Sequence, residues 1–483
     1  MLEEPSLRYA ARACGGQLKG AMVETLFQGV SSDSRRIRAG EIFVALRGDQ
    51  FDGHDYLQQV AERGAAAAIV SDRRKVPADF PLPVIEVGDT LRALQEFAAN
   101  YRRAMLLRTV AVTGSNGKTS TKEMLATLLA ERFCAVKTEG NLNNHIGVPL
   151  SLLRIRRSHE VGVFEMGMNH PGELAPLAEM VAPSVSIITN VGPAHLEGMG
   201  DEQAVAREKA AAILALPPDG VAVLNADNRW TSFLRRRAVS RVVTAGFAAD
   251  ANVRAANVQR LADGVEFDLV LPPLDSTNWP RVVPPRGPVD ESPSPIRVKL
   301  AAIGDHWISN ALLASAAARV FGLTTDEIAA GFAKIALPAM RMQSSEVEGV
   351  RWINDAYNAN PDSMRAALQA LAAWPCSGRR VAVLGDMLEL GVESEPLHRQ
   401  LGAEAARLKL DLLVTVGPMA GVIAGEARAG GIPTHNIVTC ESVPQAALVL
   451  QARVQPGDTV LVKASRGMKL EPLVPKPPTA GVE

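Results

Sequence analysis

Apolar residues along this 483-residue chain occur mostly as short uninterrupted runs, each followed by Gly, Asn or Asp. From Leu106 onward, the runs "RTVAVTG", "VGVFEMG", "VSIITNVG" and "GVAVLNAD" alternate with stretches of helical periodicity. Strands of a parallel sheet give this pattern, because helices cover both faces of the sheet. The residues that end such strands meet at one edge of the sheet, so we expect a ligand site there.

The same type of pattern occurs on both sides of this central region. Short strand candidates at 41–46, 65–70 and 83–87 precede an amphipathic helix from Asp89 to about Arg103. The runs "RVAVLGDM", "DLLVTVG" and "DTVLVKAS" come near the C-terminus. The predicted fold class is α/β with three domains, which suits the length. These are a small N-terminal α/β domain (1–105), a central mostly parallel sheet (106–336) and a C-terminal Rossmann-like domain (337–483).

Three segments are interpreted from proline, glycine and capping signals. Residues 272–295 lie between two strand candidates and hold too many prolines for a central strand, so we expect a flexible surface insertion in a hairpin. The next helix is predicted to start with Asp305 as its N-cap and to stop at Gly322. The tail, 475–483, is expected to be disordered.

Composition and charge remove several classes of function. Lys and Arg (51) nearly balance Asp and Glu (52), so no basic field favours nucleic acid or an acidic membrane. The N-terminus is acidic where a signal peptide is basic, and no apolar run reaches the ~20 residues of a membrane span. We therefore expect a cytoplasmic protein. The four cysteines form no CxxC pair, which argues against a zinc site or a disulfide framework: Cys14, Cys134, Cys376 and Cys440.

The segment "AVTGSNGKTSTKEML" (111–125) carries the strongest chemical signal. It places a glycine-rich loop between a buried strand and a helix, which is the setting of a phosphate-binding loop. Gly114 and Gly117 let backbone N–H groups converge on phosphate oxygens, Lys118 adds a positive charge, and Thr119 can bind Mg²⁺. A simple Gly-rich turn is the weaker alternative. The loop is shorter than the usual Walker form, since Val112 stands at the position of its first glycine.

Further polar residues follow neighbouring strands. Glu165 ends "VGVFE", and His195 follows "VSIIT". Taken singly, each reads more readily as a cap or loop residue, but Mg²⁺ needs oxygen ligands beside the loop hydroxyl. Four polar residues between a turn and an apolar helix suggest a surface that orients a polar substrate, although asparagine also suits turns: Asn141, Asn143, Asn144 and His145.

Seven motifs together resemble the Mur ligase family over essentially the whole chain. They are "TGSNGKT", "GNLNNHIGVPLSLL", "EMGMNHPGEL", "TNVGPAHLEGMG", "GDHWISNALLA", "NDAYNANPDSM" and "LGDMLELG". The short phosphate loop is that family's version. The resemblance implies three domains, for a UDP-sugar, for ATP and for the incoming amine. The third and sixth motifs are most similar to the branch that adds D-alanyl-D-alanine to UDP-N-acetylmuramoyl-tripeptide through an acyl phosphate, in peptidoglycan synthesis for the cell wall.

The resemblance also implies roles for residues that spacing does not single out. Lys209 matches a lysine that family members carry as a carbamate, which would help bind a second Mg²⁺ beside Thr119, Glu165 and His195. From sequence alone Lys209 is an ordinary helix-surface residue. The implied ATP-binding residues are Gly114, Ser115, Asn116, Gly117, Lys118, Thr119, Ser120, Asn310, Arg341 and Asp355.

Substrate-binding residues are implied in the outer domains, and a monomer is expected. "SSDSRRIRAGEIFVALRGDQFDGHDY" (31–56) is similar to the family's uridine-diphosphate segment, although solvated surface charge remains an equal alternative for its arginines. The implied UDP-sugar residues are Ser31, Asp33, Ser34, Arg35 and Arg47, with the four polar residues at 141 and 143–145. The implied dipeptide residues are Tyr357, Asn358, Asn360, Lys463, Ser465 and Arg466.

Three other functions remain as alternatives. A ligase that adds the third amino acid would carry an Asp-Asn-Pro-Arg motif in its diaminopimelate form, which is absent. A folylpolyglutamate synthase shares the ATP core but has no UDP-binding first domain. A P-loop regulatory protein without chemistry leaves the set of Glu165, His195 and Lys209 unexplained.

Overall fold

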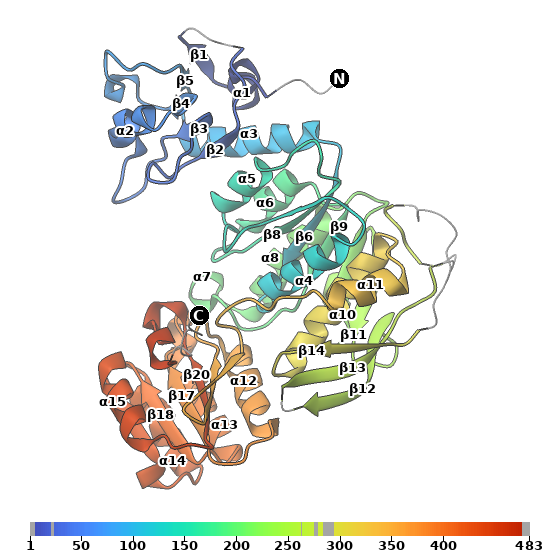
Figure 1. Cartoon of the computed structure of the whole chain (residues 1–483), viewed down its shortest axis with the longest axis vertical. Helices are drawn as coiled ribbons and strands as arrows, with labels where there is room; N and C mark the ends of the chain where they lie inside the picture. The colour runs from blue at the N-terminus through green and yellow to red at the C-terminus, as the bar shows by residue number, and fades with distance from the viewer. Residues whose placement is uncertain (1–4, 21–23, 262, 275–278, 284–293, 476–483) are drawn as a thin grey trace, which may run out of the picture.

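The computed structural model describes residues 5–20, 24–261, 263–274, 279–283 and 294–475. These residues form three sheets that follow one another along the long axis of the molecule, from the blue N-terminal part to the red C-terminal part (Figure 1). Most neighbouring strands are parallel, so the predicted α/β class is confirmed. Within the described residues, no helix has the length and apolar character needed to cross a membrane.

The first sheet has the order β1-β5-β4-β3-β2. All its pairs are parallel except β1 with β5. The strand candidates at 41–46, 65–70 and 83–87 become β3, β4 and β5, and their buried faces form the core with α1 and α3. Its strands and helices are β1 Gln17–Lys19, β2 Gly29–Ser31, β3 Glu41–Val44, β4 Ala67–Val70, β5 Val84–Glu86, α1 Leu7–Ala13, η1 Gly53–Tyr56, α2 Leu57–Glu62, η2 Arg73–Lys75 and α3 Thr90–Ala104.

The central sheet has the order β14-β13-β12-β11-β10-β9-β6-β8-β7 and changes character along its width. The strands from β7 to β12 are parallel, whereas β12, β13 and β14 form antiparallel pairs. The strands are β6 Arg108–Thr113, β7 Ala135–Lys137, β8 Val161–Glu165, β9 Val185–Ile188, β10 Val221–Asn225, β11 Arg241–Gly246, β12 Val253–Leu261, β13 Gly264–Val270 and β14 Ile296–Leu300. The helices are α4 Lys118–Leu129, α5 Gly147–Leu152, α6 Leu174–Val181, α7 Leu196–Met199, α8 Glu202–Leu214, α9 Thr231–Arg235, α10 Asp305–Val320 and α11 Thr325–Phe332.

The third sheet has the order β15-β16-β20-β17-β18-β19 and is parallel except for β15 with β16. The strands are β15 Gln343–Val347, β16 Val350–Asn354, β17 Arg380–Gly385, β18 Leu412–Val416, β19 Ile437–Cys440 and β20 Thr459–Lys463. The helices are α12 Pro361–Ala373, η3 Gly391–Glu393, α13 Ser394–Arg407, α14 Ala420–Ala429, η4 Thr434–Asn436, α15 Val443–Arg453, η5 Arg466–Met468 and η6 Glu471–Leu473.

Helix α3 joins the first sheet to the central one. It lies within one residue of the predicted bounds, with Asp89 as its N-cap, and its apolar face packs on the first sheet. At its other end Tyr101 donates a hydrogen bond to the carbonyl of Ile155 (2.9 Å). Arg102, which is 7% exposed, donates to the carbonyl of Val181 (3.1 Å) and to other oxygens of the central unit. Burial lowers the pKa of Arg102 to about 10. The helix therefore belongs to both cores.

Two expectations about the region 272–322 are resolved in part. The antiparallel pairing of β13 with β14 confirms the hairpin on which the Pro-rich segment was placed, while residues 275–278 and 284–293 of that segment lie outside the described residues. Residues 476–483 of the tail also lie outside them.

The N-cap prediction for α10 was wrong. Gly304 (φ 106°) is the N-cap, Asp305 is the first helical residue, and the carboxylate of Asp305 pairs with Arg260 (2.6 Å).

Candidate ATP and ligation site

The glycine-rich loop follows β6 and opens α4, at the carboxyl edge of the central sheet. Gly114 (φ 152°) and Gly117 (φ 79°) have backbone conformations that L residues rarely adopt. A Cβ at Gly114 would lie 1.8 Å from the hydroxyl oxygen of Thr189, and a Cβ at Gly117 would lie 2.3 Å from Oδ1 of Asn310. Glycine is required at both positions, because the loop passes closely between the end of β9 and α10.

One side chain of the loop contacts the loop itself, and another contacts a distant part of the chain. The ammonium of Lys118 donates to the carbonyl of Gly114 (2.8 Å), and burial lowers its pKa while Glu165 opposes that shift. The hydroxyl of Thr119 accepts a hydrogen bond from Arg341 (3.1 Å), which precedes the third sheet. Cationic groups from two units of the chain therefore meet at the loop, as binding of a triphosphate would require.

Glu165 lies at the end of β8 and is 2% exposed. Its Oε1 accepts a hydrogen bond from Asn143 (2.7 Å), whereas its buried Oε2 has no hydrogen-bond partner in the described structure. The nearest cation is Lys122 of α4, whose ammonium lies 3.8 Å from Oε2 and donates to the carbonyl of Thr138 (2.8 Å). Lys122 is fully buried and was not among the residues predicted from the sequence. A buried carboxylate oxygen without a hydrogen-bond partner suits a cation ligand.

His195 precedes α7 and makes its contact with the third unit of the chain. Its Nδ1 lies 2.5 Å from a carboxylate oxygen of Glu389, and the hydrogen bond lowers the pKa of Glu389. Among the described residues, no group of three His, Cys, Asp or Glu side chains is arranged to hold a metal ion. A metal ion at this site would therefore need the hydroxyl of Thr119 or phosphate oxygens as further ligands.

Lys209 lies on α8 and is 2% exposed, in contrast to the surface position that its sequence context suggests. Burial lowers its pKa well below the ordinary value, and the nearby charge of Lys118 lowers it further. Lys209 is not among the residues that line the cavity described below.

Asn310 of α10 is placed against the phosphate loop. It is 6% exposed, and its Oδ1 lies against the backbone of Gly117 and accepts a hydrogen bond from Thr121 (3.3 Å). One turn earlier on the same helix, burial lowers the pKa of His306 to about 4. Both His306 and Asn310 line the cavity described below.

The third sheet contributes a connected set of polar groups at the ends of β16 and β20. Lys463 forms an ion pair with Asp355 (2.6 Å) and donates to the carbonyl of Asn358 (2.9 Å). The guanidinium of Arg341 lies 4.2 Å from the centre of the Tyr357 ring. The remaining predicted dipeptide residues are also anchored: Asn360 exchanges two amide hydrogen bonds with Asn116 (2.8 and 3.2 Å), Ser465 donates to Ala359 (3.3 Å), and Arg466 pairs with Glu471 (3.3 Å).

The asparagine-rich segment, residues 141–145, has two structural roles. Asn144 accepts backbone N–H bonds from Ile146 and Gly147 at the start of α5, which is the turn chemistry considered above. Asn143 instead holds Glu165. A cavity of about 1080 Å³ joins this segment, the phosphate loop, Glu165, His195, Asn310 and the polar set of the third sheet. The structure thus brings most of the predicted site residues together.

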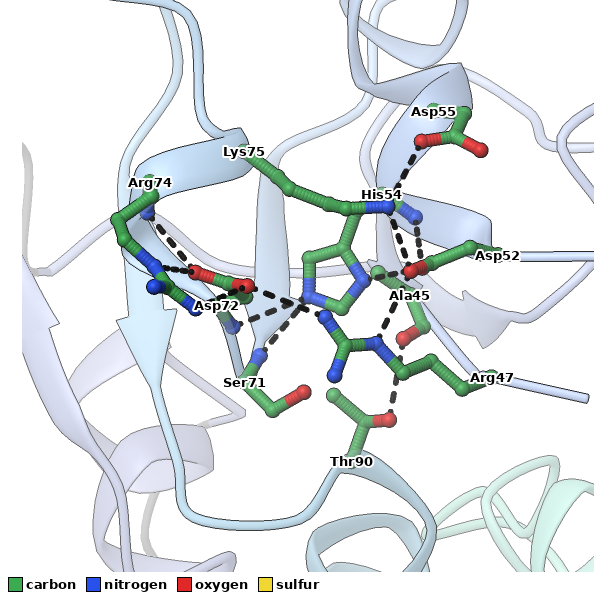
Figure 2. Close-up of polar contacts among 10 residues, drawn as sticks. All are labelled: Ala45, Arg47, Asp52, His54, Asp55, Ser71, Asp72, Arg74, Lys75 and Thr90. Carbon is green, nitrogen blue, oxygen red and sulfur yellow. Dashed lines mark hydrogen bonds and ion pairs between the residues drawn. The ribbon is translucent and has the colours of Figure 1, made fainter.

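The five residues predicted in the first unit do not line this cavity. Asp33 pairs with Arg35 (2.9 Å), Ser31 donates to the carbonyl of Asp33 (3.3 Å), and Ser34 is buried. Arg47 reaches Asp52 (3.0 Å) and Asp72 (3.3 Å), and Figure 2 shows the ring of His54 between those carboxylates.

His54 organises this second polar group and was not predicted from the sequence. It is 2% exposed, its Nδ1 donates to Asp52 (2.6 Å), and its Nε2 accepts from the backbone N–H groups of Ser71 (3.0 Å) and Asp72 (3.3 Å) (Figure 2). Contacts with Lys75 and His54 lower the pKa of Asp52, although its burial opposes the shift. The only available signal was the "DGHDY" segment itself.

Three family models match successive parts of the chain. The "Mur ligase family, catalytic domain" model matches residues 26–102, the "Mur ligase middle domain" model matches 112–318, and the "Mur ligase, glutamate ligase domain" model matches 340–466.

Relatives and solved structures resemble the chain over nearly its full length. The UDP-N-acetylmuramoyl-tripeptide–D-alanyl-D-alanine ligase of Escherichia coli (strain K12) is 38% identical over 95% of both chains, and that of Bacillus subtilis (strain 168) is 33% identical over 93% of both. A crystal structure of MurF from Acinetobacter baumannii has a TM-score of 0.84 at 31% identity, covering 98% of both chains. MurF ligase from Thermotoga maritima in complex with ADP has a TM-score of 0.77 at 28% identity, covering 92% of this chain and 96% of that one. The chain therefore belongs to the Mur ligase family, and its resemblance is to the MurF-type members.

Proposed function

We propose that the chain is an ATP-dependent ligase that joins D-alanyl-D-alanine to UDP-N-acetylmuramoyl-tripeptide and so forms a peptidoglycan precursor. The observation that carries the proposal is the match over more than nine tenths of the chain to enzymes of that name. The cavity supports it, because it joins the phosphate loop to polar groups of the third sheet. ATP binding is further supported by the likeness to a MurF structure that holds ADP.

The proposed reaction has two steps, and neither needs a nucleophile from the protein. The carboxylate of the tripeptide attacks the γ-phosphorus of ATP, which gives an acyl phosphate and ADP. The amine of the dipeptide then attacks the acyl carbon, phosphate leaves, and the amine loses a proton. Such steps depend on positioning and on neutralising charge. The backbone N–H groups of the loop, Lys118 and Arg341 would carry that task, and the contacts of Lys118 and Arg341 with the loop support this assignment.

The donor set suits Mg²⁺, of which we propose two ions. Thr119 would contribute its hydroxyl and Glu165 its unpartnered Oε2, with His195 toward the second ion. Bound there, Mg²⁺ supplies charge neutralisation at the phosphate oxygens. Lys209 would join as a carbamate, because burial lowers its pKa and the neutral amine is the form that reacts with CO₂.

The remaining substrate assignments belong to the same proposal. Asn310 and Asp355 would hold the nucleoside of ATP, and the polar set around Tyr357, Asn360 and Lys463 would hold the dipeptide. The UDP-sugar would lie between the first unit, with Arg35 and Arg47, and the asparagine-rich segment. We also propose that the enzyme acts as a monomer in the cytoplasm, where ATP and nucleotide-sugars are available.

The test uses the purified full-length chain with Mg·ATP, D-alanyl-D-alanine and UDP-N-acetylmuramoyl-tripeptide that carries either lysine or diaminopimelate. We expect phosphate release that requires the dipeptide, and a product heavier by one D-alanyl-D-alanine unit. Lys118→Ala should abolish both signals. If neither tripeptide gives product while a single amino acid or a folate supports turnover, the substrate assignment is wrong. Phosphate release that ignores every amine would point to a nucleotide switch instead.

A further inference from the structure

The contact between His195 and Glu389 joins two units of the chain through backbone as well as side chains. The backbone N–H of Glu197 donates to the carbonyl of Glu389 (3.1 Å), next to the side-chain contact of 2.5 Å. Gly391 (φ 55°) brings its backbone so close that a Cβ there would lie 3.1 Å from Cα of Glu197. The start of α7 with the preceding His195 therefore fits against the start of η3 and the preceding Glu389, and both His195 and Glu389 line the cavity.

Both partners of this contact have a strained backbone. His195 has φ 57° and Glu389 has φ 63°, in the left-handed region that favours glycine. Such a conformation is unfavourable for a residue with a side chain and is retained where surrounding contacts hold it. Two strained residues that meet across a boundary between units suggest that the contact has a task beyond packing.

The chemistry of the pair indicates that task. A carboxylate only accepts hydrogen bonds, so Nδ1 of His195 is the donor, and Nε2 is the ring nitrogen left for another partner. Within the described residues Nε2 makes no hydrogen bond. A histidine that binds a metal through one nitrogen is oriented in this way when a carboxylate takes the proton of the other nitrogen.

We propose that Glu389 is a positioning residue that fixes the ring of His195 so that Nε2 is free to bind a divalent cation in the cavity. The inference rests on the proposed function, because it takes His195 as a cation ligand. Glu389 belongs to the third unit and His195 to the central unit, so the ring is held only while the two units are in contact. Cation binding is thereby coupled to the arrangement that also brings the dipeptide residues to the phosphate loop.

The test measures binding of Mn²⁺ to the full-length protein in the presence of ADP, by electron paramagnetic resonance of the free ion. We expect Glu389→Ala to weaken Mn²⁺ binding about tenfold or more, in the range typical of residues that orient a metal ligand. Glu389→Gln should bind within about threefold of the natural chain, since its amide oxygen still accepts from Nδ1. Glu393→Ala, an exposed carboxylate of the same segment, is the matched control and should bind normally.

A second comparison asks whether Glu389 acts through His195. In a His195→Ala background, Glu389→Ala should cause no further loss of Mn²⁺ affinity, because the ring that it holds is gone. The proposal is wrong if Glu389→Ala binds Mn²⁺ as Glu393→Ala does, or if its effect persists without His195. The thermal midpoint should change little, because the Glu389 side chain is 55% exposed. Mn²⁺ binding requires no dipeptide transfer, so this result is separate from the ligase assay.

Discussion

Replacing Lys122 with methionine would remove the cation that is buried between the phosphate-loop helix and the candidate metal carboxylate. Lys122 is fully buried, pairs with Glu123 (2.9 Å), and donates to the carbonyl of Thr138. Its ammonium is also the nearest cation to Glu165, at 3.8 Å. Methionine has a similar volume, so the change tests charge and hydrogen bonding more than packing.

The expected cost follows from what the substitution leaves behind. Removing one partner of a buried ion pair typically costs about 3–5 kcal/mol, because the other charge stays buried without compensation. Glu123 keeps its contact with Lys137, so we expect the lower end, about 3 kcal/mol. That cost corresponds to about a hundredfold increase in local opening.

Hydrogen exchange measured on peptides of α4 and β8 is the suitable assay, because a chain with three sheets need not unfold in one transition. Lys137→Met is the matched control: Lys137 contacts the same Glu123 but is 41% exposed, so its loss should cost less than about 1 kcal/mol. If Lys122→Met peptides exchange no faster than those of Lys137→Met, the buried ammonium does not stabilise this region and the reasoning fails.

Three further changes have defined outcomes. Gly117→Ala should weaken ATP binding at least tenfold in a calorimetric titration, because its Cβ would collide with Asn310; unchanged affinity would contradict the loop geometry. His306 has a folded pKa of about 4, below the ordinary ~6.5, so the unfolded chain takes up a proton first and stability falls as pH drops from about 6.5 toward 4. His306→Gln should therefore lose less of its thermal midpoint between pH 7 and pH 5 than the natural chain, and an equal loss would refute this assignment. Asn116→Ala removes both amide hydrogen bonds to Asn360. In the phosphate-release assay it should raise KM for the dipeptide about tenfold. An increase confined to KM for ATP would show that Asn116 does not position Asn360.

The pattern of apolar runs predicted the central part of the site well. Strands β6, β8 and β9 are neighbours, so the residues that follow them meet at one sheet edge. That rule places the glycine loop beside Glu165 and near His195. The alternation of strands and helices was sufficient, because these residues lie within one continuous sheet.

Contacts between the three units could not be predicted from the pattern of apolar runs. Arg341 meets Thr119, and Glu389 meets His195, across separations of about two hundred residues that no local period reports. Only the family resemblance suggested Arg341, and Glu389 was part of the motif "LGDMLELG" without an assigned role. Lys122 was missed for another reason: it sits in the polar run "TSTKE", and the turn around Thr138 that buries it comes after the helix.

Helix α3 bears on the length of the peptide that the proposed nucleotide-sugar substrate would carry. It shares the core of the first sheet and is tied to the central unit through Tyr101 and Arg102. At its N-terminal end Thr90 donates to the carbonyl of Ala45 (3.0 Å), two residues before Arg47, and at its C-terminal end Arg102 contacts Thr109 at the start of β6. One helix therefore fixes the polar group around Arg47 relative to the central sheet. On the proposed function, a nucleotide-sugar bound at the first unit would present its peptide carboxylate to the phosphate loop only if the peptide spanned the interval between them. On that proposal the rigid connection through α3 would make the length of the bound peptide a criterion for choosing the nucleotide-sugar substrate.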